Sequence, residues 1–222
     1  MDWGKFVYLL IIILIGYLPY KVLQKKLPRG LNDISNSTAL LLGAWFLILS
    51  GLLLSQIKEL NVSIPTWILV AVSLTSAIWF SVPFLIRKIG VYPDKVISQK
   101  PTLFVVKFDP HTLYLKFFEV LFQQIKFLFM LSVVLVTLSP IDRTIIFTLI
   151  IGFFHFNNLF FLPKREAMVF FILSFPMAVL FSILILRGYV LLTLSIHLWF
   201  YLLFAGYPWI VNRNFSRLDL RK

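Results

Sequence analysis

The chain carries long apolar runs, each of a length that can cross a lipid bilayer. A helix needs about 20 predominantly apolar residues to span the hydrocarbon core, where no water can bond its backbone. Proline, glycine and clustered charges separate the runs, as is typical of turns. The sequence therefore predicts one all-α domain over residues 1–222, a polytopic membrane protein with a bundle of about seven transmembrane helices. The predicted spans cover residues 5–23, 39–57, 65–86, 112–138, 144–162, 166–186 and 188–210.

Composition supports a membrane protein and argues against several other classes. Hydrophobic residues make up 60% of the chain and the mean hydropathy is +0.93, more apolar than the usual soluble domain. Basic loops beside an anionic cytoplasmic leaflet explain the net charge of +12, so membrane lipids are the expected partner and nucleic acid is not. The chain has no cysteine, which excludes disulfides, thiolate metal sites and a cysteine nucleophile.

Basic residues are distributed unevenly between the two sides of the predicted bundle. The loops after the first, third and fifth spans and the C-terminal tail hold 15 of the 21 Lys and Arg residues. Because basic loops stay in the cytoplasm, we expect the N-terminus outside and the C-terminus inside. The first span lacks a small-residue cleavage site and is expected to be retained. The absence of an ER-retention signal favours a prokaryotic cytoplasmic membrane. The apolar patch in the loop 88–111 is too short to span and is expected at the interface.

The fourth span contains an unusual set of polar residues in the stretch "FFEVLFQQIKF". Ionisable side chains inside a membrane are costly and mark candidate functional sites. Lys116, Glu119, Gln123 and Lys126 follow one another at spacings of three, four and three. Residues three or four apart share a helix face, so we expect this face to point into the bundle.

Two later spans each contribute a histidine followed one turn later by a polar residue. His155 precedes Asn158 in the fifth span, and His197 precedes Tyr201 in the seventh. These histidines and Glu119 are expected at membrane depths that would let them share a cavity. A structural role is the alternative for each of them, with Glu119 in a buried ion pair with a lysine and the histidines bonded across helices.

Residues 110–205 resemble the CPBP intramembrane proteases, the family that includes the type II CAAX prenyl endopeptidases. That family has a glutamate pair followed by xxFR, then FxxxH, then HxxxN on successive helices. The matching stretches here are "FEVLFQQ" at 118–124, "IGFFH" at 151–155 and "HLWFY" at 197–201. The chain departs from the pattern at Phe118, Gln123, Ile151 and Tyr201, which replace a glutamate, the arginine, the phenylalanine and the asparagine.

The resemblance implies a metal-independent endopeptidase without a cofactor. Glu119 and His155 would activate a water molecule, and His197 with Tyr201 would stabilise the oxyanion. Gln123, Asn158, Lys116 and Lys126 would support or bind a membrane-associated peptide or protein substrate. The replacement of the first glutamate by Phe118 leaves activity or its loss equally open.

Three other functions stay open from the sequence. A catalytically inactive relative would bind a peptide or protein in the same cavity, as an immunity or scaffold protein. A small transporter is less favoured, because no inverted repeat is present. A zinc enzyme is also less favoured, because its ligands would come one from each of three helices, and no HExxH pair exists. The contacts of Glu119 distinguish these functions. If Glu119 pairs with a lysine while the histidines bond elsewhere, the family resemblance is accidental and the enzyme hypothesis is dropped.

Overall fold

The computed structural model describes residues 1–27, 33–57, 64–89, 109–156 and 164–203, and the regular secondary structure in these ranges is helical. The prediction of an all-α membrane bundle is confirmed. The helices are α1 (Trp3–Lys26), α2 (Asn36–Leu54), α3 (Thr66–Ile89), α5 (Pro110–Phe129), the π-helical turn η2 (Met130–Val134), α6 (Pro140–Phe156), α7 (Lys164–Leu186) and a last helix, Val190–Leu203.

Five of the described helices are long and apolar enough to cross a membrane: α1, α2, α3, α5 continued through η2, and α7. They coincide with five of the predicted spans. The other two spans correspond to α6, which has 17 residues, and to the shorter helix Val190–Leu203. The predicted ends of these two spans, and most of the loop 88–111, lie outside the described residues.

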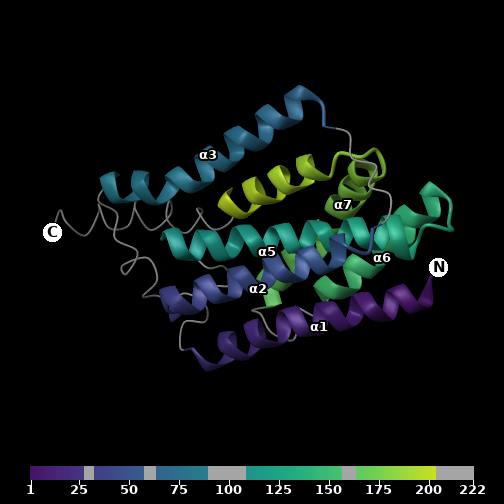
Figure 1. The fold of residues 1–222 in the computed structure, drawn as a ribbon, viewed down its shortest axis with the longest axis horizontal. Coiled ribbons are helices and arrows are strands. Elements are labelled where there is room, and N and C mark those ends of the chain that lie inside the picture. The colour runs from purple at the N-terminus through teal and green to yellow at the C-terminus, as the bar shows by residue number, and fades with distance from the viewer. Residues whose placement is uncertain (28–32, 58–63, 90–108, 157–163, 204–222) are drawn as a thin grey trace.

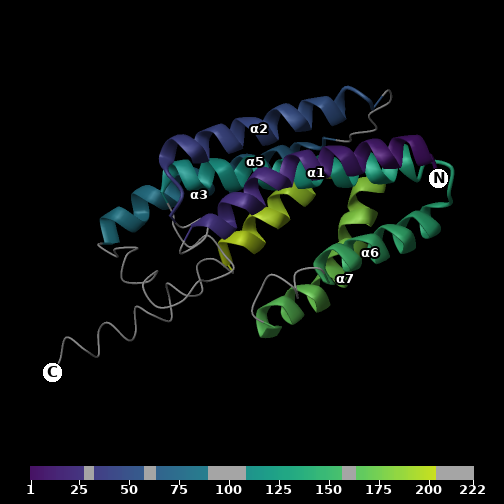
Figure 2. The same ribbon diagram turned by 90° about the horizontal axis from the view of Figure 1, so that it is seen from below.

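Helix α5 lies at the centre of the bundle. The α5–η2 span is 61% buried, compared with 18% for α1. It contacts α2, α3 and α7, whereas α6 packs mainly on α7. Figure 1 shows α2 and α3 on opposite sides of α5, with α1 beyond α2. The second view shows α6 and α7 projecting as a pair from one side (Figure 2). Helix α5 is therefore surrounded by its neighbours.

Local sequence signals set where α5 begins and where α7 ends. Asp109 caps α5 by accepting bonds of 3.0 Å from the backbone N–H groups of His111 and Thr112, with Pro110 at the first helical position. Such a cap accepts hydrogen bonds from the first backbone N–H groups, which have no acceptor within the helix. At the other end of the bundle Gly188 has φ 84°, the left-handed conformation that ends α7 and turns the chain into the last helix.

Two glycines allow close contact between helices. A Cβ at Gly43 of α2 would lie 2.4 Å from Tyr114 Cε1 of α5, and one at Gly152 of α6 would lie 2.7 Å from Phe175 Cζ of α7. Small residues let helix backbones approach closely where lipid supplies no hydrophobic driving force. These contacts fix α5 against α2 and α6 against α7.

Arg143 closes the turn between η2 and α6. Its guanidinium donates to the carbonyl of Leu138 at 2.8 Å, to that of Leu131 at 3.4 Å, and to that of Val136. These carbonyls belong to the end of the fourth span and its following turn, where helix geometry leaves acceptors without donors. A single planar side chain therefore satisfies several acceptors of this turn.

Candidate functional site

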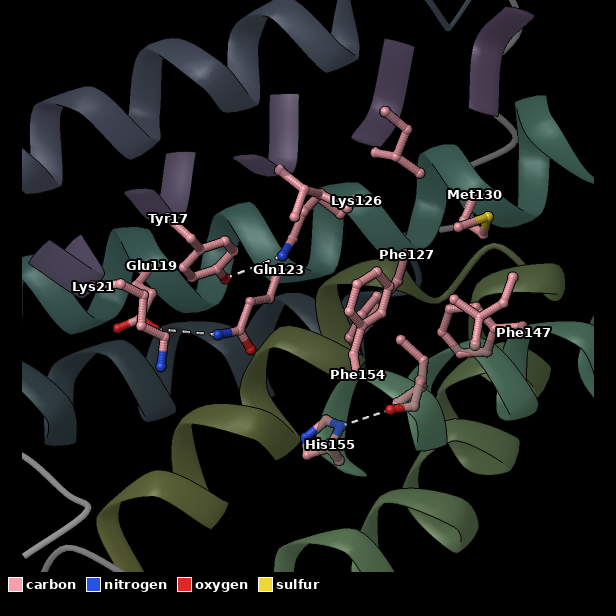
Figure 3. Close-up of a pocket in the computed structure, with 14 residues that line it drawn as sticks. Tyr17, Lys21, Glu119, Gln123, Lys126, Phe127, Met130, Phe147, Phe154 and His155 are labelled. Carbon is pink, nitrogen blue, oxygen red and sulfur yellow. Dashed lines mark hydrogen bonds between the residues drawn. The ribbon is translucent and has the colours of Figure 1, made fainter. Parts of the chain in front are cut away.

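Glu119 forms an ion pair on its own helix. Lys116 Nζ lies 2.6 Å from Glu119 Oε2, and the two side chains are 11% and 10% exposed. Gln123 Nε2 donates to Glu119 Oε1 at 3.4 Å (Figure 3). The predicted polar face of α5 is thus observed, since helical spacing brings these side chains together. In this arrangement the carboxylate charge is compensated by the lysine one turn earlier.

Lys126, the last member of this face, bonds to a different helix. Its Nζ donates to the hydroxyl of Tyr17 on α1 at 3.1 Å. The same ammonium lies 4.3 Å from the centre of the Tyr17 ring and 4.9 Å from that of Phe122. Both distances are within the range of cation–π attraction. The amine is therefore held over aromatic faces and away from an ion pair with Glu119.

The two candidate histidines make separate hydrogen bonds. His155 Nδ1 donates to the carbonyl of Ile151 on its own helix at 2.9 Å. His197 Nδ1 lies 2.8 Å from Gln124 Nε2 on α5, and because an amide nitrogen donates, this ring nitrogen accepts. In the neutral rings, Nε2 of His155 is consequently an acceptor and Nε2 of His197 carries the proton.

Two adjoining cavities connect these groups. The first, of about 310 Å³, lies between α1, α5 and α6. The second, of about 70 Å³, reaches α7 and the last helix. Glu119 and His155 line the first cavity, and His155 and His197 line the second. The polar residues around the first cavity are Tyr17, Lys21, Glu119, Gln123, Lys126 and His155. Residues on the walls of both cavities are Gln123, Phe127, Ile151 and His155.

Not every candidate residue reaches these cavities. Tyr201 does not line them; its buried ring packs on Trp79 at 5.5 Å, with Lys116 Nζ 5.6 Å from the ring centre. Asn158 lies outside the described residues. Lys116 lines neither cavity and contacts the site through its ion pair with Glu119. Within the described ranges, no three His, Asp or Glu side chains are close enough to share a metal ion.

Sequence reasoning missed the contribution of α1 and the role of Gln124. Tyr17 and Lys21 lie on the wall of the first cavity, and a signal for them existed in their four-residue spacing beside a polar face of α5. Gln124 is not among the predicted site residues, and in the structure its side chain bonds to His197. Its Oε1 atom is buried without a hydrogen-bond partner in the described part of the chain.

The site combines an amphiphilic cavity with polar groups that already have partners. The volume of the first cavity is at the lower end of the range for small-molecule sites.

No known protein family, curated protein or solved structure matches the chain.

Proposed function

We propose that this chain is a membrane-embedded binding protein that holds an amphiphilic ligand in the cavity between α1, α5 and α6 without hydrolysing it. The observation that carries the proposal is the 2.6 Å contact between Lys116 and Glu119. A carboxylate compensated by a lysine on the same helix is a poor proton acceptor, because protonation would leave the lysine charge unpaired in a low-dielectric site.

The walls of the first cavity support an amphiphilic ligand. Polar side chains from α1, α5 and α6 line one part, and the aliphatic and aromatic side chains of Leu9, Ile13, Met130, Phe147 and Ile150 line the rest. Apolar walls with a few convergent polar groups are typical of ligand sites.

The proposal includes a location and a topology. The protein lies in a prokaryotic cytoplasmic membrane, with its N-terminus outside the cell and its C-terminus in the cytoplasm. The charge distribution between loops supports it. The chain lacks cysteine, so single cysteines introduced at Asp2 and at Lys222 report their own side without background. An impermeant maleimide added to intact cells should label the first and spare the second. Labelling of the second alone would reverse the topology.

Binding can be tested by filling the cavity from α1. Ile13→Trp places a bulky side chain on the cavity wall, and Ile11→Trp is its control because Ile11 is 49% exposed on the same helix. Radiolabelled laurate and methyl laurate are equilibrated with each detergent-purified variant. We expect Ile13→Trp to lose saturable binding of whichever probe binds and Ile11→Trp to retain it. Equal binding by the two variants, or no saturable binding of either probe to the unmodified protein, would overturn the proposal.

An intramembrane endopeptidase is the second candidate, and one observation favours it. His155 lines both cavities, and its bond to Ile151 leaves Nε2 as an acceptor that could take a proton from water. A fluorogenic membrane-anchored peptide with a prenylated cysteine is the test substrate. This candidate requires cleavage by the unmodified protein that both Glu119→Gln and His155→Ala abolish. Cleavage that survives both substitutions, or none at all, would reject it.

A further inference from the structure

The three helices around the larger cavity change from apolar to polar in the same spatial direction. On α1 the lining residues are Leu9, Ile13, Tyr17 and Lys21, spaced four apart. On α5 the order runs from Met130 and Phe127 back to Lys126, Gln123 and Glu119, and on α6 from Phe147 through Ile151 to His155. The apolar ends of α5 and α6 meet where the rings of Phe127 and Phe147 lie 5.2 Å apart.

Contacts between helices fix this alignment. The Tyr8 ring lies 6.0 Å from that of Phe129, and Asp2 N–H donates to the carbonyl of Val134 at 2.9 Å. The start of α1 therefore lies beside the end of the α5 span, and Tyr17 reaches Lys126 further along. At the rise of 1.5 Å per residue, the stripe from Leu9 to Lys21 is about 18 Å long. The cavity wall thus offers one elongated ligand an apolar end and a polar end.

Basic side chains outnumber acidic ones at the polar end of the cavity. Two lysines, Lys21 and Lys126, and one carboxylate, Glu119, line it. Lys116, which does not line the cavity, already compensates that carboxylate at 2.6 Å. Gln123 adds an amide at the same end. An anionic group would therefore meet an excess of basic side chains and hydrogen-bond donors there. The low local dielectric would strengthen the electrostatic attraction between them.

Resting on the proposed function, we infer that the ligand is an anionic single-chain amphiphile whose head group binds at Lys126 and Lys21 and whose chain lies along Ile13, Phe127 and Phe147. One chain fits better than two, because a cavity of about 310 Å³ is at the small end of the range for ligand sites. A long-chain carboxylate and a lysophospholipid phosphate share this chemistry.

The test compares probes that differ in one feature. Laurate carries both charge and chain, methyl laurate only the chain, acetate only the charge, and lysophosphatidate carries a phosphate in place of the carboxylate. Each is titrated against the detergent-purified full-length protein. We expect laurate to bind at least about ten-fold more tightly than methyl laurate, the size expected for one charge-assisted contact. Acetate should not bind saturably, and the stronger of laurate and lysophosphatidate identifies the head group.

Substitutions locate the head group. Lys126→Gln and Lys21→Gln should each weaken laurate binding by about ten-fold and leave methyl laurate unchanged. Lys126→Gln can still bond the Tyr17 hydroxyl, and Lys21→Gln tests the same site without touching that contact. Lys26→Gln is the control, because Lys26 is exposed at the end of the same helix, and we expect it to bind laurate normally.

The outcomes separate the two proposals. Equal affinity for laurate and methyl laurate, with no effect of either lysine substitution, would overturn the anionic ligand while leaving cavity binding in place. An equal loss in Lys26→Gln would also overturn it, because general surface charge would then explain the preference. Saturable binding of neither long-chain probe would overturn both the inference and the binding function.

Discussion

Lys116 and Glu119 are joined by a 2.6 Å contact one turn apart on the most buried of the five described membrane-length helices. The pair explains how a carboxylate resides inside a membrane span, because each charge lowers the cost of burying the other. The two histidines, which the family resemblance would group with Glu119, instead bond to Ile151 and Gln124. The contacts of the site favour a structural role for Glu119 in the cavity wall over a role in acid–base catalysis.

Removing one partner of the Lys116–Glu119 ion pair should lower stability more than replacing both partners with apolar residues. Lys116→Met removes the ammonium group that lies 2.6 Å from a buried carboxylate, so we expect a loss of about 3–5 kcal/mol in the free energy of unfolding. The double variant Lys116→Met/Glu119→Met should recover most of that loss. Unfolding by a denaturing detergent measures both. The exposed Lys26→Met is the control and should change stability by less than about 0.5 kcal/mol. Equal losses in the single and double variants would show that the pair is not coupled.

Gly43 should not tolerate a side chain. In Gly43→Ala the new Cβ would lie 2.4 Å from Tyr114 Cε1, and the Tyr114 ring is itself packed edge-on against Phe118. We expect a cost of about 1–3 kcal/mol from overpacking, partly recovered by adding Tyr114→Leu. Gly51→Ala on the same helix is the control, since nothing lies within 4 Å of its Cβ position. Similar thermal stabilities for the two alanine variants would refute the close α2–α5 contact.

The hydroxyl of Tyr17 should contribute to stability independently of its ring. Tyr17→Phe keeps the aromatic face beneath Lys126 but removes the acceptor of its 3.1 Å bond. We expect a loss of about 1–3 kcal/mol, because a buried ammonium loses a partner. Tyr8→Phe is the matched control, since its ring packs on Phe129. Chemical unfolding of both variants gives the comparison, and an equal effect would argue against the Lys126 contact.

Arg143 should not be replaceable by lysine. Its planar fork serves three carbonyls around the turn after η2, whereas an ammonium is a single point donor. Arg143→Lys should therefore lower stability by about 1–3 kcal/mol, because carbonyl acceptors of the turn lose their donors. The exposed Arg187→Lys carries the same chemical change after α7 and should be nearly neutral. Matching melting temperatures of the two variants would contradict this role.

The sequence predicted those features that follow from helical spacing alone. One helix face holds Lys116, Glu119 and Gln123, because residues three and four apart lie on the same face. In the structure, Glu119 accepts hydrogen bonds from the other two. Span positions were also predictable, since apolar length is a strong local signal. Helix starts were less accurate: α5 begins at Pro110 rather than 112, because the Asp109 cap and Pro110 together start the helix two residues earlier.

Features that depend on packing between helices were not predictable from spacing. Tyr201 was expected beside His197, yet a four-residue step rotates a side chain by about 40°. The last helix borders both α3 and α5. Because of this rotation, Tyr201 packs on Trp79 of α3. The contribution of Tyr17 and Lys21 likewise requires knowing that α1 runs antiparallel to α5. No local pattern specifies which helices become neighbours.

The most direct test of the central claim is a map of where a bound amphiphile contacts the protein. Laurate carrying a terminal diazirine is bound, photolysed and located by mass spectrometry of the digested protein. We expect labelled residues on α1, α5 and α6 together, near Leu9, Met130 and Phe147, and their loss in Ile13→Trp. Labels confined to lipid-facing positions such as Leu14 and Leu18, 64% and 57% exposed, and unchanged by Ile13→Trp, would contradict the account.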